Sequence, residues 1–201
     1  TKNGVRLDEV WGHIYMALVA IAGVHSVNYV HNDIDRGNIV IDSNGVLKLT
    51  DFGMASRGRH PSCSGKPYYF APETFSKRYF LDHHSYQYTQ ARDLFQIGNV
   101  MLEAVLDRPG EVYQCSQYGL KFGITKDDRK GNLKVVVEDK GKFKKFQKSY
   151  GSVSTETIDE QTCVSTDAQA GVVEHLATKG LEKAIEKLEK KFKGARYLSP
   201  F

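Results

Sequence analysis

Residues 31–53 contain the stretch that decides the fold: His31-Asn32-Asp33-Ile34-Asp35-Arg36-Gly37-Asn38, a short apolar run, and then Asp51-Phe52-Gly53. An Asp, an Asn five positions later and a second Asp before Phe-Gly are the parts needed to hold ATP with Mg²⁺. The same set can aim a hydroxyl at the γ-phosphate. The stretch therefore predicts phosphoryl transfer as the leading chemistry.

The apolar run between these residues has the pattern of a β-hairpin. Two β-rich runs, 38–42 and 46–50, are joined at Ser43-Asn44-Gly45, and Asn-Gly between apolar runs is a strong hairpin signal. The hairpin places Asn38 just before its first strand and Asp51 just after its second. Two oxygen ligands then lie close together, as Mg²⁺ requires. Asp33 lies on the preceding loop, where a carboxylate can accept a proton from a substrate hydroxyl.

The rest of the chain alternates helical and strand-like patterns. Apolar residues at three- and four-residue steps predict helices over 7–29, 91–106 and 167–193. Thr166 with Gln169 predicts a capping box for the last helix, and Gly194 its end. Residues 54–73 and 149–166 are predicted as loops. The strand-like runs are Leu120–Thr125, Asn132–Glu138 and Lys142–Lys148.

Composition is that of an ordinary globular protein. The 201 residues are 40% hydrophobic and 26% charged, with a net charge of +4, so neither a nucleic-acid partner nor a membrane span is expected. The lysine tracts 140–148 and 187–193 are interpreted as solvated faces. Three widely spaced cysteines form no metal pattern, which predicts free thiols and a reducing, cytoplasmic compartment.

Five motifs in order resemble the C-terminal lobe of a eukaryotic-type protein kinase, over residues 7 to about 106. His31–Asn38 is similar to H-R-D-L-x-x-x-N, and the helix ending Val27–Val30 is similar to the one before that loop. The other three motifs are VLKLTDFG (46–53), GKPYYFAPE (65–73) and DLFQIG (93–98).

The resemblance implies a role for each matching residue. Asp33 would be the catalytic base, and Asn38 and Asp51 would hold Mg²⁺ and ATP together with Phe52 and Gly53. His31 and Phe52 would pack beneath the site. Asp93 would hydrogen-bond the backbone of the His31–Asn38 loop, and Glu73 would pair with a buried Arg, for which Arg196 is the candidate. The implied substrate is a protein hydroxyl.

Several positions depart from the family pattern. Asn32 stands where Arg normally receives an activation-loop phosphate, so we expect a loop arranged without phosphorylation, whether or not Ser62 and Ser64 are modified. Asp35 replaces a Lys that neutralises the γ-phosphate, and is interpreted either as a surface carboxylate or as a partner of Lys66. Arg36 or Lys66 is the candidate for the missing positive charge. Lys66 replaces a Thr and can also pair with Asp33 or Asp35. The resemblance implies serine/threonine specificity, although these two changes leave tyrosine specificity open.

No small N-terminal lobe can be assigned before residue 7, because a glycine-rich loop and its lysine are not recognisable there. A partner or a further segment is therefore expected to complete that lobe. Residues 118–148, with Lys134 before a valine run, have two interpretations. They form either a substituted nucleotide lid or an unusual insertion in the substrate lobe.

These patterns together predict an α+β, protein-kinase-like fold. It would have a mainly helical lobe over 1–109 with a short β-hairpin, and a divergent segment over 110–201 in the same domain. The predicted activity is ATP- and Mg²⁺-dependent protein kinase. The alternatives are a pseudokinase or scaffold, a kinase fragment, and a small-molecule phosphotransferase of the aminoglycoside or choline type. The compact, divergent form also resembles kinases that pathogens deliver into host cells or that viruses carry.

Overall fold

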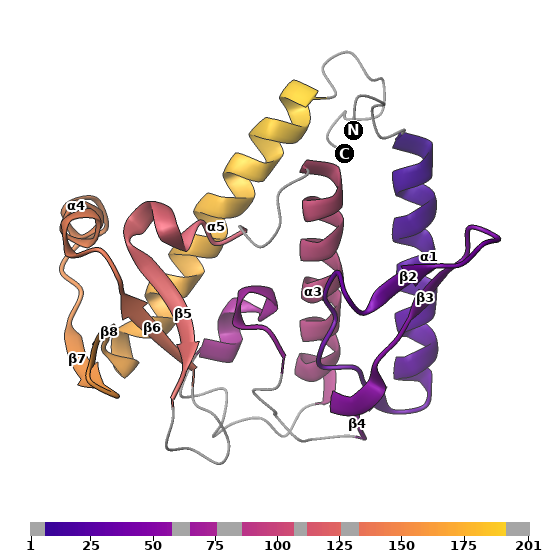
Figure 1. Cartoon of the computed structure of the whole chain (residues 1–201), viewed down its shortest axis with the longest axis horizontal. Helices are drawn as coiled ribbons and strands as arrows, with labels where there is room; N and C mark the ends of the chain where they lie inside the picture. Colours follow the sequence, from indigo (N-terminus) through magenta and orange to yellow (C-terminus); the bar gives the residue numbers. More distant parts are fainter. Residues whose placement is uncertain (1–6, 58–64, 76–85, 107–111, 126–132, 192–201) are drawn as a thin grey trace.

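The computed structural model describes residues 7–57, 65–75, 86–106, 112–125 and 133–191. Helices α1 (Leu7–Ser26) and α3 (Tyr86–Leu106) lie side by side, as Figure 1 shows. Both helices were predicted from their apolar spacing, and both are confirmed. α1 ends earlier than predicted because Asn28 takes the left-handed conformation, with φ of 60°, and turns the chain into a strand. None of the helices in these ranges combines the length and apolar character that crossing a bilayer requires.

The predicted hairpin is confirmed. β2 (Ile39–Ile41) and β3 (Leu47–Leu49) pair in antiparallel register, with Ile39 opposite Leu49. The carboxylate of Asp42 closes the turn by accepting hydrogen bonds from the backbone N–H groups of Asn44 and Val46. Gly45 adopts φ of 77°, which glycine reaches without strain. Leu47 and Ile39 pack into a small core with α1 and α3, and this packing fixes the hairpin against the two helices.

A second strand pair lies beside the hairpin. β1 (Tyr29–Val30) pairs antiparallel with β4 (Ser56–Arg57), so that Val30 faces Ser56. The short 3₁₀ helix η1 (Phe52–Met54) connects β3 to β4. The segment that follows Asp51 therefore pairs with the two residues that immediately precede His31.

The second half of the chain forms a four-stranded antiparallel sheet in the order β5-β6-β8-β7, flanked by two helices. In Figure 1 the sheet and α1 lie on opposite sides of α3. The long helix α5 runs between the sheet and α3. The bounds are η4 (Cys115–Tyr118), β5 (Leu120–Ile124), β6 (Leu133–Val137), α4 (Lys140–Tyr150), β7 (Thr155–Ile158), β8 (Gln161–Val164) and α5 (Thr166–Lys191).

The prediction of a strand over 142–148 is wrong, because α4 occupies those residues. Asp139 caps this helix by accepting hydrogen bonds from the N–H groups of Gly141 and Lys142. Phe143 and Phe146 are buried at a three-residue step, and the Tyr150 ring stacks on Phe146 one turn later. The Phe residues favour a strand by composition, but their three-residue spacing is helical.

The predicted loop over 149–166 is also wrong, because it contains the β7–β8 hairpin. Its turn places Asp159 and Glu160 in succession at positive φ, a hairpin-turn geometry that polar residues tolerate. Helix α5 is confirmed, although its capping box is not. The Thr166 hydroxyl donates to the Glu156 carboxylate, while the carbonyl of Ser165 receives the N–H of Gln169. The predicted stop at Gly194 lies outside the described residues.

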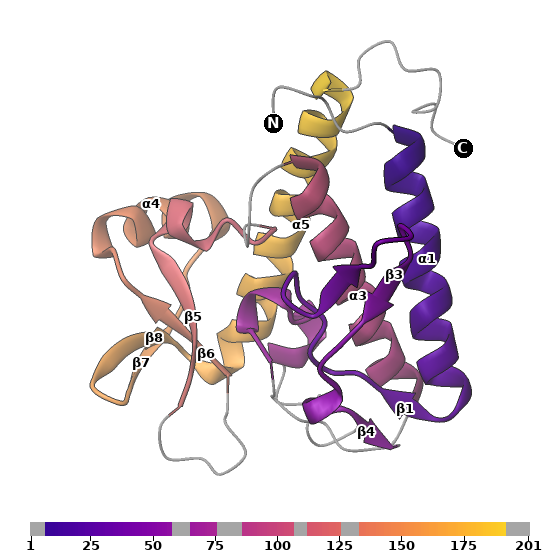
Figure 2. The ribbon, with the colours of Figure 1, turned by 45° about the vertical axis from the view of Figure 1, so that its right-hand side comes forward.

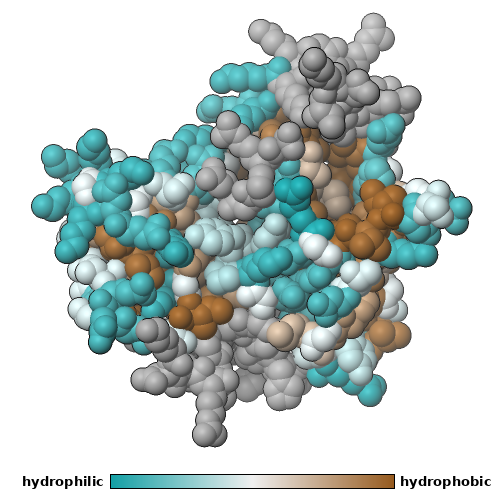
Figure 3. Space-filling model, in the orientation of Figure 1, coloured by the Kyte–Doolittle hydropathy of each residue, from teal (hydrophilic) through white to brown (hydrophobic). Residues whose placement is uncertain are grey.

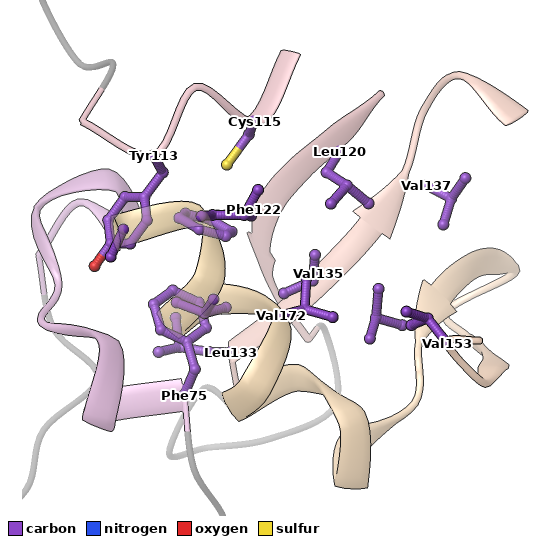
Figure 4. Close-up of a cluster of buried hydrophobic side chains, with 14 of the residues drawn as sticks. Phe75, Tyr113, Cys115, Leu120, Phe122, Leu133, Val135, Val137, Val153 and Val172 are labelled. Carbon is purple, nitrogen blue, oxygen red and sulfur yellow. The ribbon is translucent and has the colours of Figure 1, made fainter. Parts of the chain in front are cut away.

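The main core joins the sheet to the 65–75 segment and to α5. Figure 4 shows Phe75, Tyr113 and Phe122 gathered at its centre, with Leu120, Leu133, Val135 and Val172 around them. The rings of Phe75 and Phe122 are 4.6 Å apart, centroid to centroid. In Figure 2 the β2–β3 hairpin and the four-stranded sheet lie on opposite sides of the molecule. Both interpretations of residues 118–148, the nucleotide lid and the insertion, stay predictions.

Candidate active site

Buried side chains of α3 fix the His31–Asn38 loop through hydrogen bonds to its backbone. The Asp93 carboxylate accepts hydrogen bonds from the backbone N–H groups of His31 (2.8 Å) and Asn32 (2.9 Å). The side-chain oxygen of Gln96 accepts the N–H of Ile34 at 3.0 Å. Buried hydrogen bonds of this kind are costly to break, since water cannot replace the lost partner. The contact predicted for Asp93 is thus confirmed.

Asp33 and Asn38 lie next to each other across this loop. The amide nitrogen of Asn38 donates to the Asp33 backbone oxygen at 2.7 Å and to its carboxylate at 3.3 Å. Because the nitrogen is used in this way, the side-chain oxygen of Asn38 is the atom available to a metal. The Asn38 carbonyl also accepts the N–H of Thr50, which precedes Asp51. The ribbon therefore brings the three predicted residues Asp33, Asn38 and Asp51 to one place.

Asp51 occupies a strained turn. Its φ is 58°, and one carboxylate oxygen accepts the N–H of Gly53 at 3.2 Å. The next side chain, Phe52, packs its ring 4.7 Å from the ring of His31, centroid to centroid. His31 is fully buried and its ring nitrogen lies 3.0 Å from the carbonyl of Thr50. The predicted contact between His31 and Phe52 is present, although Phe52 is 49% exposed. The contact supports the turn that presents the exposed carboxylate of Asp51.

The donor set at this place fits Mg²⁺. Asn38 and Asp51 offer amide and carboxylate oxygens, the ligand types that this hard cation prefers. Within the described residues, no three His, Cys, Asp or Glu side chains gather into a metal-binding group. An ion bound here would complete its coordination with water or phosphate oxygens, as Mg²⁺ does in phosphoryl-transfer sites.

Asp35 is an ion-pair partner rather than a surface carboxylate. It is 3% exposed, and its Oδ2 lies 2.5 Å from Nζ of Lys66. Its other oxygen accepts the N–H of Gly37 at 2.5 Å. The surface interpretation of Asp35 is wrong because the loop turns this side chain inward, toward the 65–75 segment. Burial raises the pKa of Asp33 most, and the Asp35 charge raises it further. The charges of Lys66 and His31 lower this pKa and offset part of the rise.

The 65–75 segment is anchored to α3 beneath the site. The Tyr69 hydroxyl donates to the buried Glu103 carboxylate at 2.7 Å. Burial, together with this hydrogen bond, raises the pKa of Tyr69 well above its usual range. The guanidinium of Arg92 lies 4.4 Å from the centre of the Phe70 ring, a cation–π distance. Tyr69 is the last residue of the 3₁₀ helix η2 (Pro67–Tyr69), Phe70 follows it, and the 3₁₀ helix η3 (Pro72–Phe75) comes next.

Sequence reasoning missed the polar stripe of α3. Arg92, Gln96, Asn99 and Glu103 follow one another at four- and three-residue steps, and all are buried. Polar residues at helical spacing within a mainly apolar helix could have indicated this stripe in the sequence. Buried polar groups need hydrogen-bond partners, so such a stripe marks a face that contacts other polar groups. Ser62, Ser64 and Arg196 lie outside the described residues, so the expectations for them stay predictions.

Comparison with known proteins agrees with this geometry. A family model described as a protein kinase domain matches residues 2–158. Mitogen-activated protein kinase kinase kinase 3 of Arabidopsis thaliana is 36% identical over 96 residues, which are 46% of this chain and 15% of that protein. Serine/threonine-protein kinase TAO3 of Xenopus laevis is 36% identical over 109 residues, 54% of this chain and 12% of that protein.

A third relative, mitogen-activated protein kinase kinase kinase 1a of Physcomitrium patens, is 30% identical over 112 residues. That alignment covers 54% of this chain and 14% of the relative, so the chain spans only a small part of the proteins it matches. The family match extends well past residue 106, where the resemblance in the sequence motifs stopped. The chain belongs to the protein kinase domain family.

Proposed function

We propose that this chain transfers the γ-phosphoryl group of ATP to a hydroxyl of a protein. The observation that carries the proposal is the junction of Asp33, Asn38 and Asp51 at one end of the β2–β3 ribbon. Positioning and charge neutralisation supply most of the rate in such transfers, so a rigid junction of this kind is what the reaction needs.

Asn38 and Asp51 are the proposed Mg²⁺ ligands, with Phe52 and Gly53 shaping the turn that presents Asp51. These two side chains would hold Mg²⁺, whose positive charge would offset that of the phosphates. The hydrogen bond from Asn38 to Asp33 links the metal ligand to the base, so both keep one orientation.

Asp33 is the proposed catalytic base. Its carboxylate accepts the proton of the substrate hydroxyl while the new bond forms between that oxygen and the γ-phosphorus. The bond between the γ-phosphorus and the bridging oxygen breaks, and ADP leaves. The raised pKa of Asp33 favours this role, because a stronger base accepts the proton more readily.

Lys66 is the proposed source of the positive charge that the His31–Asn38 loop lacks. Its ammonium pairs with Asp35, and the side chain is 63% exposed, so it is accessible to a substrate. The relatives named serine/threonine-protein kinases support serine or threonine as the acceptor.

A face of exposed apolar side chains lies around the ribbon. Val40, Ile41 and Val46 on the hairpin, and Phe52 and Met54 after it, are 42–52% exposed. Figure 3 shows brown atoms over the hairpin on the right-hand side of the molecule. Apolar patches of this kind usually mark contacts with another protein surface or a ligand. We propose that a partner or a further segment covers this face and tightens the ATP binding that this chain provides by itself.

Two alternatives predict different products. A small-molecule phosphotransferase would label aminoglycosides or choline and leave proteins unlabelled, whereas a pseudokinase would label neither. The experiment is transfer from γ-labelled ATP with Mg²⁺ to a generic protein substrate and to these alcohols in parallel. Label on serine or threonine of the protein supports the proposal. Label on small alcohols alone contradicts it, and so does an absence of transfer.

A further inference from the structure

Asn32, which immediately precedes Asp33, is held in an unusual conformation. Its φ is 68°, a left-handed value that Asn tolerates better than most other non-glycine residues. The residue is fully buried, and its backbone N–H donates to Asp93. Its carbonyl accepts from Arg92 at 3.3 Å and from Gln96 at 3.4 Å. The backbone is thus fixed by α3, and the side chain points toward the chain after Asp51.

The side-chain amide of Asn32 joins the strand before it to the chain after Asp51, and its two N–H groups are shared among three acceptors. Its nitrogen lies 2.9 Å from the Ser56 hydroxyl, 3.1 Å from the Met54 carbonyl and 3.3 Å from the Val30 carbonyl. Two of these acceptors are carbonyl oxygens, which can only be matched by a donor. An amide fits this place, whereas a carboxylate of the same shape would face two oxygens without a proton to share.

These contacts bear directly on where Asp51 lies. Met54 and Ser56 follow the Asp51-Phe52-Gly53 turn within five positions. The β1–β4 ladder that returns them to the loop has only two residue pairs. Such a short ladder is marginal on its own, so side-chain bonds must contribute to its position. The amide of Asn32 supplies them from the residue next to Asp33.

We propose that Asn32 is a positioning residue that sets the placement of the Asp51 turn relative to Asp33. It acts through Met54 and Ser56 and touches neither substrate nor metal. The inference rests on the proposed kinase function for its effect on rate, but its structural part stands independently. It predicts that the 51–57 segment opens more often when the amide is lost.

The test variant is Asn32→Asp, which keeps size and shape but replaces the amide donor. Asn28→Asp is its matched control, because Asn28 is exposed and also left-handed, with φ of 60°. Ser56→Ala removes the shortest of the three bonds without placing a charge in the interior, and Ser26→Ala on exposed α1 surface controls for it. Two measurements are made on each variant: amide hydrogen exchange over 51–57, and the dependence of kcat on Mg²⁺ concentration.

We expect faster exchange over 51–57 in Asn32→Asp and, to a smaller extent, in Ser56→Ala. We also expect kcat to fall in Asn32→Asp by on the order of 100-fold, the scale of a 1 Å misplacement. The Mg²⁺ concentration for half-maximal rate should rise, while the KM for the protein substrate stays unchanged. The two controls should match the wild type.

Exchange and kcat in both Asn32→Asp and Ser56→Ala equal to those of their controls would overturn the inference. So would a change in the substrate KM alone. If the wild type transfers no phosphate, the proposed function fails, and the exchange comparison then decides the positioning role by itself. If Asn32→Asp does not fold, Ser56→Ala against Ser26→Ala decides both measurements.

Discussion

The Nζ atom of Lys66 lies 2.5 Å from the Oδ2 atom of Asp35 and joins the 65–75 segment to the His31–Asn38 loop. We expect Lys66→Met to lower kcat by on the order of 100-fold, because a charge that stabilises the transferring phosphoryl group would be lost. Lys48→Met is the matched control, since Lys48 also pairs with an Asp at 2.8 Å but at the distant hairpin turn. Steady-state kinetics of the two variants measures this, and equal rates would show that Lys66 is only structural.

The acidic limb of the pH–rate profile should follow the pKa of Asp33. A base accepts a proton only when it is ionised, so a raised pKa moves the loss of activity to a higher pH than for an ordinary Asp. The Asp35 charge raises this pKa, and Lys66 lowers it. Asp35→Asn should therefore shift the limb to lower pH, and Lys66→Met to higher pH. Profiles of kcat/KM from pH 4 to pH 8 (about the range in which a shifted Asp titrates) test both signs. Shifts in the same direction would contradict the account.

Gly65 should not tolerate a side chain. Its φ is 102°, and a Cβ atom there would lie 2.8 Å from the Asp33 carboxylate and 3.2 Å from the Asn32 carbonyl. Gly45 has φ of 77° but nothing within 4 Å of its Cβ position. Gly45→Ala should therefore cost only the conformational term of about 1–2 kcal/mol in unfolding free energy. Gly65→Ala should lose more stability and, in addition, most of its activity. Denaturant unfolding and kinase assays on the pair measure this, and similar behaviour would show that the close approach to Asp33 has no role.

The hydrogen bond from Tyr69 to Glu103 should stabilise the 65–75 segment. Both side chains are buried, and hydrogen bonds to charged groups contribute about 1.5–3 kcal/mol. Tyr69→Phe should lower the unfolding free energy by about that amount. Tyr15→Phe removes a hydroxyl from a side chain that is 70% exposed and should change it by less than about 0.5 kcal/mol. Urea denaturation of both variants is the measurement, and an unchanged midpoint for Tyr69→Phe would refute the anchoring role.

The hairpin and the helices could be predicted because their signals are local. Asn44-Gly45 fixes a turn by backbone preference alone, and helices α1, α3 and α5 repeat apolar residues at helical steps. The α4 helix was missed because its Phe residues favour a strand by composition, although the three-residue step from Phe143 to Phe146 is helical. Asp139 is the N-cap of this helix. An Asp indicates a cap only when a helix is already expected after it, so this signal could not identify α4 by itself.

The residues that meet at the candidate site could be predicted from their order, whereas most of their surroundings could not. The pairing of Asp35 with Lys66 was one of two interpretations and is confirmed, but the burial of Asp35 could not be predicted, because Lys66 is thirty-one positions away. The amide contacts of Asn32 depend on β4 returning to β1, which no local pattern announces. Contacts between segments distant in the sequence thus decide which polar side chains become buried. Local sequence patterns do not show these contacts.

The most direct test of the central claim is phosphoryl transfer from γ-labelled ATP by the wild type, Asp33→Asn and Asp42→Asn. Asp42 closes the hairpin turn, where Asn can also cap, so its variant controls for loss of an Asp elsewhere. We predict Mg²⁺-dependent labelling of protein by the wild type and by Asp42→Asn, with a rate lower by about 100- to 10,000-fold in Asp33→Asn. Equal labelling by Asp33→Asn and Asp42→Asn would contradict Asp33 as the base. No labelling by the wild type would contradict the proposed kinase activity itself.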